Sequence, residues 1–151
     1  MNHTVARDPT GAHLAVLDRA TCLALLQGAD VARIGVVDTD GCPIVLPVSY
    51  TLVNIDDNPS IVVRTRPGNV LDRPGTPACI EIDGVDPGHD GGWSVLVRGL
   101  LRATRPDDEL DPHPIPAGER DAWLVLEPTV ISGRRLIAPP MRWAYNPAGY
   151  A

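Results

Sequence analysis

Two arginines and a threonine precede a Pro-Gly pair in the segment 60–71, which reads SIVVRTRPGNVL. Guanidinium and hydroxyl donors match the geometry of a phosphate group, so Arg64 and Thr65 could bind an anion. Gly68 would let backbone amides approach that anion, and a helical turn beginning near Asn69 would point N–H groups at it. The alternative is a solvent-exposed turn that closes a strand between flanking arginines. The segment therefore indicates either an anion site or an ordinary turn.

The composition is that of one globular domain. The chain has 151 residues, enough to bury a sizeable core, and 44% of them are hydrophobic. The net charge is −6 and the 13 cations, all arginines, are scattered along the chain, which argues against nucleic-acid binding. No apolar run approaches the ~20 residues of a membrane helix, and the N-terminus lacks an apolar signal segment. We therefore expect a cytoplasmic protein without membrane contact.

Residues suited to metal binding or acid–base catalysis are not grouped in this sequence. Cys22, Cys42 and Cys79 match no zinc spacing, and the four histidines form neither an HExxH motif nor a close pair. We expect reduced, packed thiols and no metal site. A catalytic triad, a paired acid and base and an activated cysteine are also absent from the pattern. That absence fits a cofactor-dependent enzyme and a non-catalytic binding protein equally well.

The order of predicted elements is one helix followed by six or seven strands. A helix is expected over 17–28, with Asp18 as N-cap, Gly28 as its end, and Cys22, Leu25 and Leu26 on one face. Turn residues separate the segments that favour strands. These strands are expected at 32–37, 43–54, 60–65, 78–83, 93–104, 123–126 and 130–137. Residues 1–13 are interpreted as a flexible arm and 138–151 as an extended tail, which leaves 14–137 as the domain.

Short strands joined by hairpin turns indicate a mainly β fold, an antiparallel β-barrel with one leading helix. Along the strand 93–104, Trp93 and Val95 should face one side and Ser94 and Arg98 the other. The segment 43–53 is apolar on both faces, and Pro47 within it requires an edge or a bulge because proline cannot donate to a ladder. A barrel needs only its inner face apolar, so the outer face must be covered. A second copy of the chain is the simplest cover, which predicts a homodimer.

Five segments carry a resemblance to a known family. They are RIGVVD at 33–38, GCPIVLPVSY at 41–50, IVVRTRPGNVL at 61–71, GWSVLVRG at 92–99 and ISGRRL at 131–136. In this order and spacing the chain resembles the pyridoxamine 5′-phosphate oxidase-like proteins. Its nearest likeness is to their actinobacterial branch, which includes nitroimidazole-reductase-like relatives. The resemblance implies an FMN-binding split β-barrel, a homodimer, and two flavins in clefts between subunits.

The resemblance also implies a set of cofactor-binding residues. The flavin phosphate would lie where the third strand meets the following turn, and the ring would lie along strand backbones. Trp93 is equally well interpreted as a core residue, and Arg134 or Arg135 could reach the cleft or lie in solvent. Two departures are Val70, where relatives often have lysine, and Arg64, where nitroimidazole-reductase-like members tend to have histidine. The implied residues are Arg64, Thr65, Gly68 and Asn69 for the phosphate, Val48 and Ser49 for the ring, and Trp93 and Ser94 for further contacts.

The function implied is that of an oxidoreductase using a flavin, FMN or a deazaflavin, on a small molecule that the sequence does not identify. In such a protein the cofactor carries the electron chemistry, and the chain orients and tunes it. The alternative is a non-catalytic split-barrel dimer that binds a flat ligand, heme or flavin, or none. Absorption of the purified protein in the flavin bands distinguishes the two hypotheses.

Overall fold

The computed structural model describes residues 12–87, 91–113 and 119–137. The predicted arm at 1–13 and tail at 138–151 lie outside these ranges, except for residues 12 and 13. The elements in chain order are β1 His13–Leu17, α1 Arg19–Gln27, β2 Val31–Val37, β3 Pro43–Ile55, β4 Asn58–Thr65, β5 Pro77–Val85, β6 Gly91–Ala103, a 3₁₀ turn at Asp108–Leu110, and β7 Ala122–Ile137.

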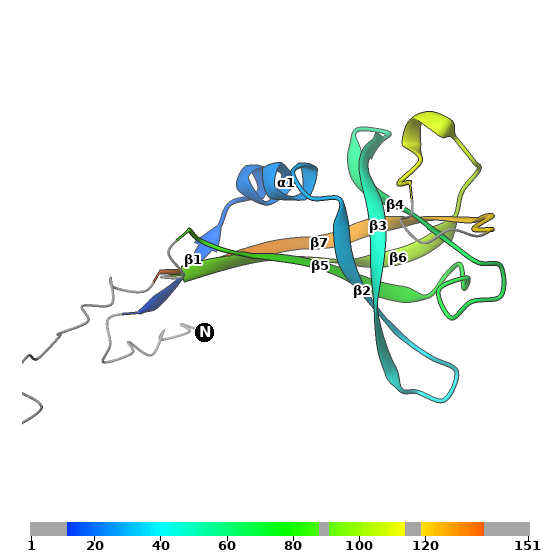
Figure 1. The fold of residues 1–151 in the computed structure, drawn as a ribbon, viewed down its shortest axis with the longest axis horizontal. Coiled ribbons are helices and arrows are strands. Elements are labelled where there is room, and N and C mark those ends of the chain that lie inside the picture. The colour runs from blue at the N-terminus through cyan, green and yellow to red at the C-terminus, as the bar shows by residue number, and fades with distance from the viewer. Residues whose placement is uncertain (1–11, 88–90, 114–118, 138–151) are drawn as a thin grey trace, which may run out of the picture.

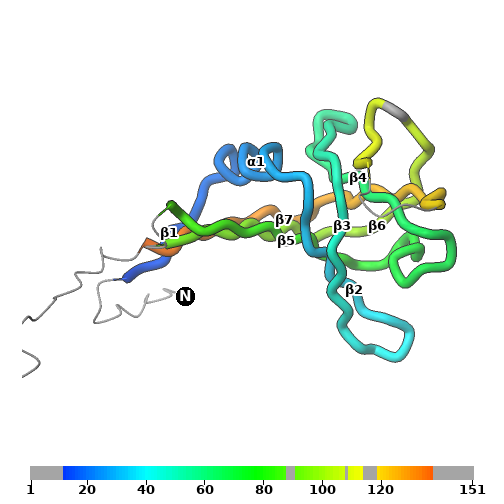
Figure 2. The backbone as a smooth tube through the Cα atoms, in the orientation of Figure 1, coloured from blue at the N-terminus to red at the C-terminus, as the bar shows by residue number. Residues whose placement is uncertain are grey.

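Six antiparallel strands close into a ring in the order β7-β4-β3-β2-β5-β6, and β6 returns to β7. Figure 1 shows β5, β6 and β7 running along the molecule, while β2 and β3 cross them steeply at one end. At the other end β1 lies beside β7, which Figure 2 shows as the extension of the sheet beyond the barrel. The predicted fold class, an antiparallel split β-barrel with one leading helix, is confirmed.

The strand β7 is one continuous element where the sequence predicts two. Pro128 and Thr129 separate the predicted segments, and the structure accommodates them by a register shift: Gly99 of β6 pairs with Pro128, whereas Arg98 pairs with Val130. The Glu127 carbonyl lies directly against the Cα of Gly99, leaving no space for a side chain. A bulge therefore allows a proline inside a strand that a regular ladder would exclude.

The helix α1 begins and ends close to the predicted residues. The Asp18 carboxylate accepts a hydrogen bond from the Thr21 N–H at 2.7 Å, and the Gly28 N–H donates to the carbonyl of Ala24 at 3.2 Å. Cys22 and Leu26 are buried in the core. Within the described ranges, no helix combines the length and apolar character that crossing a membrane requires.

The core follows the strand alternation that the sequence predicts. On β6, Val95, Val97 and Leu101 are fully buried, and Arg98 and Arg102 are exposed. Trp93 lies on the inner side, packs against the core cluster, and covers Gly84 of β5 so closely that a Cβ there would lie 2.6 Å from the indole ring. The three cysteines are free thiols, as predicted, but Cys42 is exposed and not packed.

The first half of β3 has an unpaired edge among the described strands. Its residues 43–49 pair with β2, whereas pairing with β4 begins only at Tyr50, opposite Val63. The Tyr50 N–H donates to the Asp30 carbonyl at 3.1 Å on the β2 side. By alternation the nitrogen of Pro47 faces away from β2, so the proline interrupts no ladder bond. The edge predicted from Pro47 is confirmed.

Candidate functional site

The barrel opens between β3 and β4, and four of the predicted site residues lie at this opening, which we call the strand split. The last β3–β4 pair is Tyr50 with Val63. Continued by one and two residues, the same register would place Ser49 opposite Arg64 and Val48 opposite Thr65. The strands separate instead. The segments 48–49 and 64–65 therefore continue from the last β3–β4 pair on the two sides of this opening.

Backbone polar groups face into the strand split. In an antiparallel ladder the N–H and C=O groups of a residue point to the same side, and the side alternates along the strand. Tyr50 faces β2, so the backbone groups of Ser49 face the β4 side, and those of Arg64 face β3 by the same alternation. Where the ladder is open, Ser49 and Arg64 can offer these groups to a flat molecule with hydrogen-bonding edges.

The side chain of Arg64 is held on the outer face of the barrel by the connection between β6 and β7. Its Nη1 donates to both carboxylate oxygens of Asp111, at 3.0 and 2.8 Å, and its Nε donates to the Arg120 carbonyl at 3.0 Å. The guanidinium also stacks over the Trp123 ring, 4.7 Å from the centroid. The Arg64 and Asp111 side chains are only 21% and 15% exposed. The arginine is thus a structural clamp on this connection.

The Asp111 carboxylate is surrounded by donors. Burial raises its pKa, but hydrogen bonds from the His113 amide and from Arg64, together with their charges, outweigh burial and hold the pKa below its usual value. At neutral pH this carboxyl group is therefore ionised and paired.

The side chain of Thr65 points the other way. Arg64 and Thr65 are consecutive strand residues, so their side chains lie on opposite faces of the sheet. Thr65 is 2% exposed and buried toward the barrel interior. The structure therefore brings the two backbones to one opening but separates the two side chains that the sequence interpretation grouped around an anion.

The turn after β4 is closed by the chain's own groups. Arg66-Pro67-Gly68-Asn69 is a β-turn with Pro67 and Gly68 (φ +75°) at its centre and an Asn69 N–H to Arg66 carbonyl bond of 3.0 Å. The Gly68 N–H donates to the Asp72 carboxylate at 2.9 Å. A second turn joins Asn69 to Asp72, but no helix begins at Asn69, so no helix dipole points at this site.

Val70, the predicted departure from the lysine that the resemblance implied, packs against the core cluster. Val70 therefore contributes to the hydrophobic interior, and its role is more than the absence of a positive charge. Beside the turn lies a hollow of about 570 Å³, lined by Arg66, Pro67 and Glu119.

Trp93 and Ser94 lie far from the strand split within one chain. The Thr104 N–H, just beyond β6, bonds the Trp123 carbonyl, and Trp123 pairs with Arg64. The distance from Trp93 to Thr104 is eleven residues of extended chain, roughly 35 Å at about 3.3 Å per residue. Ser94 lines a separate hollow of about 260 Å³ with Arg134, whereas Arg135 is paired with Asp86 at 2.9 Å.

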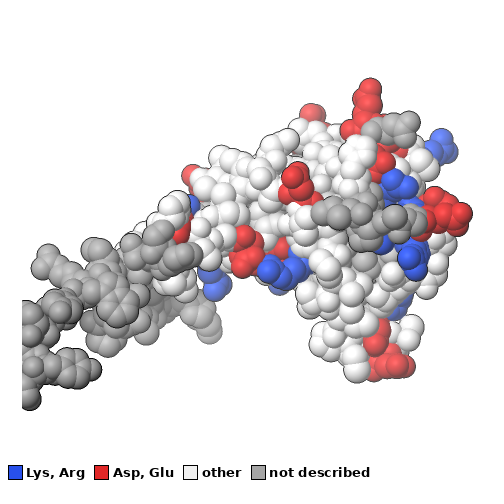
Figure 3. Space-filling model, in the orientation of Figure 1, with Lys and Arg blue, Asp and Glu red and all other residues white. Residues whose placement is uncertain are grey.

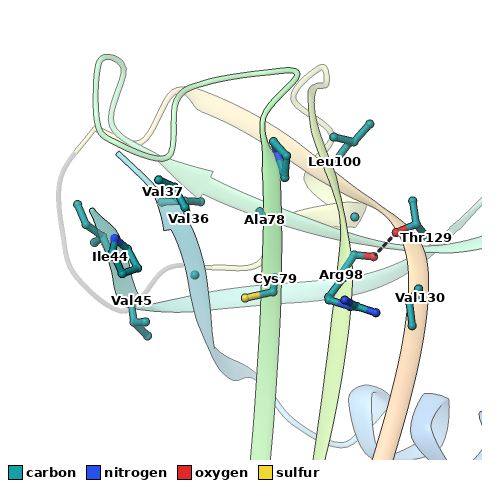
Figure 4. Close-up of a pocket in the computed structure, with 14 residues that line it drawn as sticks. Val36, Val37, Ile44, Val45, Ala78, Cys79, Arg98, Leu100, Thr129 and Val130 are labelled. Carbon is teal, nitrogen blue, oxygen red and sulfur yellow. Dashed lines mark hydrogen bonds between the residues drawn. The ribbon is translucent and has the colours of Figure 1, made fainter. Parts of the chain in front are cut away.

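An apolar groove of about 640 Å³ runs across β2, β3, β5, β6 and β7 (Figure 4). Gly35 lines this groove, and a Cβ at this position would lie 2.8 Å from the Cys79 sulfur. Val45 and Val37, which line it, are 63% and 54% exposed. In the view of Figure 3, acidic and basic atoms are interspersed between broad uncharged areas, with no continuous basic surface.

Two residues that matter at this site, Asp72 and Asp111, were not predicted. Asp72 lies four residues after Gly68, and nothing in the sequence indicates that its carboxylate bonds the Gly68 amide. Asp111 is 47 residues from Arg64 and has no local signal. Among the described residues, no group of three or more metal-ligating side chains is found.

A family model described as pyridoxamine 5′-phosphate oxidase matches residues 18–135, and the chain belongs to this family. A structure of the FAD-binding protein from Mycobacterium smegmatis is 26% identical, with a TM-score of 0.61, covering 82% of this chain and 98% of that one. An FAD-binding protein from Mesorhizobium loti shares the fold at 17% identity, with a TM-score of 0.64, covering 83% of this chain and 98% of that one. A flavocytochrome from Azotobacter vinelandii also shares the fold at 17% identity, with a TM-score of 0.56, covering 93% of this chain and 76% of that one. No curated protein matches the sequence.

Proposed function

We propose that this protein is a flavin-dependent oxidoreductase that acts on a small molecule, with FMN or a deazaflavin bound at the strand split. The observation that carries the proposal is the end of the β3–β4 ladder before Ser49 and Arg64, which leaves the backbone donors and acceptors of these two residues without a ladder partner among the described strands. Family membership and the 26% identical FAD-binding protein support the same cofactor class. A bound flavin would supply the chemistry, because its ring accepts a hydride and passes on one or two electrons.

The residues at the split fit the ring system of a flavin. The Ser49 N–H and C=O can pair with the polar edge of the ring, and the half-buried Val48 supplies apolar surface beside it. Pro47 and Pro43 remove other N–H groups from the same edge of β3, so Ser49 is one of the few donors left there. The chain would thus orient the ring through backbone hydrogen bonds.

We also propose that the working unit is a homodimer. The predicted contacts from Ser94 and Trp93 lie roughly 35 Å along β6 from the split, so they can reach the same flavin only from a second copy. The apolar groove with its exposed Val45 and Val37 offers a face for that copy. A twofold arrangement would bring the Ser94 end of one subunit to the strand split of the other.

The first test is the absorption spectrum of the purified protein, before and after addition of FMN. Flavin bands that remain after gel filtration support the proposal. A colourless protein that does not quench the fluorescence of added FMN or riboflavin contradicts it and supports the non-catalytic alternative.

A sharper test changes one backbone donor. Ser49→Pro removes the N–H that faces the split, at an edge where Pro43 and Pro47 are already tolerated. Ser49→Ala is the matched control, because it changes the side chain at the same position and keeps the backbone N–H. We expect Ser49→Pro to weaken flavin binding about three- to tenfold relative to the control, the value of one net hydrogen bond. Equal affinities in two folded variants would show that the ring does not bind this edge.

A further inference from the structure

The groups that would hold a phosphate at the end of β4 already hold carboxylates of the same chain. The Gly68 N–H donates to Asp72 at 2.9 Å, and Arg64 Nη1 donates to both oxygens of Asp111. Carboxylate and phosphate oxygens use the same donors and carry the same sign of charge. A phosphate at this place would therefore have to displace an acidic side chain or lie beside it.

Further contacts hold Arg64 and Asp111 in place and make it harder for a phosphate to displace the Asp111 carboxylate. Asp111 also accepts the His113 amide at 2.9 Å, so it is held by donors besides Arg64. Arg64 is further fixed by Trp123 and by the Arg120 carbonyl. Moving Arg64 or Asp111 would break several contacts at once, and both side chains are largely buried.

Arg66, the other arginine of the segment 60–71, does not offset the effect of these two carboxylates. Arg66 is exposed, and the hollow beside it is also lined by Glu119. An anion that approaches Arg66 from this hollow meets a carboxylate on the same wall. No helix N-terminus compensates, because the residues after Gly68 form turns.

We propose that Asp72 and Asp111 are specificity-determining residues that prevent this turn from binding the flavin phosphate. The ring is then the recognised part, and the protein does not distinguish FMN from riboflavin. This inference rests on the proposed function for the presence of a flavin, but it concerns a different part of the ligand. It departs from the phosphate contacts that the family resemblance implies for Arg64 and Gly68.

The direct test compares the dissociation constants of FMN and riboflavin for the full chain, measured by quenching of flavin fluorescence. We expect the two constants to agree within about threefold. A site that uses Arg64 and Gly68 for the phosphate would prefer FMN by about tenfold or more. Such a preference, abolished by Arg64→Ala, would overturn the proposal.

The variant Asp72→Ala tests the mechanism of exclusion. It frees the Gly68 amide and removes one negative charge, so FMN should bind about tenfold more tightly while riboflavin binding stays unchanged. Asp40→Ala is the matched control, because it removes the same charge from the exposed turn between β2 and β3. Tighter FMN binding in both variants would reveal only a general charge effect and would contradict the specific role of Asp72.

An experiment without flavin separates this inference from the proposed function. The amide signal of Gly68 is followed by NMR while inorganic phosphate is added. We expect no shift in the wild type and a saturable shift in Asp72→Ala. If no flavin binds to the wild type, the proposed function fails, but the phosphate titration still decides the inference: a saturable shift of Gly68 in the wild type, or none in Asp72→Ala, would refute it.

Discussion

The role of Arg64 as an internal clamp leads to a prediction about stability. The variant Arg64→Ala removes the donors to Asp111, the donor to the Arg120 carbonyl and the stack on Trp123. It also leaves the Asp111 carboxylate, 15% exposed, without its counter-charge. The connection between β6 and β7 should lose the attachment to β4 that these contacts provide.

The magnitude follows from these contacts. A hydrogen bond that involves a charged group contributes about 1.5–3 kcal/mol net, and a partly desolvated cation–π contact about 1 kcal/mol. Partial exposure of Arg64 reduces the sum, so we expect a loss of about 3 kcal/mol in the free energy of unfolding. For a chain of this size that corresponds to a fall of about 6–12 °C in melting temperature.

The assay is urea unfolding followed by tryptophan fluorescence, together with thermal melting. Arg66→Ala is the control, because Arg66 is an exposed arginine two residues away, and its loss should change stability by less than about 0.5 kcal/mol. Arg64→Lys keeps the charge but not the planar fork, so it should recover only part of the loss. Equal stability of Arg64→Ala and Arg66→Ala would refute the clamp.

The pH dependence provides a second check on the same pair. Because the pKa of Asp111 lies below its usual value in the folded chain, its contribution is present above the unfolded pKa and is lost as pH falls through the folded pKa. The stability difference between the wild type and Arg64→Ala should therefore be constant near neutrality and should shrink below about pH 4.

Three further predictions concern the helix, the outer face and the core. Gly133→Ala should destabilise the chain by about 1–3 kcal/mol, because the new Cβ would lie 2.6 Å from the Cys22 sulfur. Adding Cys22→Ala to the same chain should restore part of this loss, which a double-mutant cycle would measure. Val45→Asp places a charge in the apolar groove and should convert the proposed dimer to a monomer by light scattering, whereas a wild-type mass near 16.1 kDa would contradict the dimer. Burial, with a smaller effect of Asp30, raises the pKa of Tyr50 to about 12, so the stability of the folded chain should fall as pH rises from about 10 to about 12. Tyr50→Phe should lack this loss. A wild-type melting temperature that stays unchanged over this pH range would disprove the prediction.

Much of the fold could be predicted because it is encoded locally. Alternation of apolar residues placed Val95 inside and Arg98 outside, and the capping residues Asp18 and Gly28 located α1. Pro47 indicated an unpaired edge by its chemistry alone. The strand β1 was not predicted because five residues with little alternation form a strand only when a longer partner extends beyond the barrel, as β7 does here.

The candidate site, like the fold, was predicted where local patterns encode it and missed where contacts are distant in the sequence. The turn signals and strand patterns assign 48–49 and 64–65 to consecutive strands, and these strands pair with each other as far as Tyr50 and Val63. The groups that face the donors could be found only in the folded chain: Asp111 reaches Arg64 across 47 residues, Asp72 folds back on Gly68, and Ser94 lies at the far end of β6. Such contacts depend on where loops return in space, and that is set by the packing of the whole barrel and by no local pattern of residues.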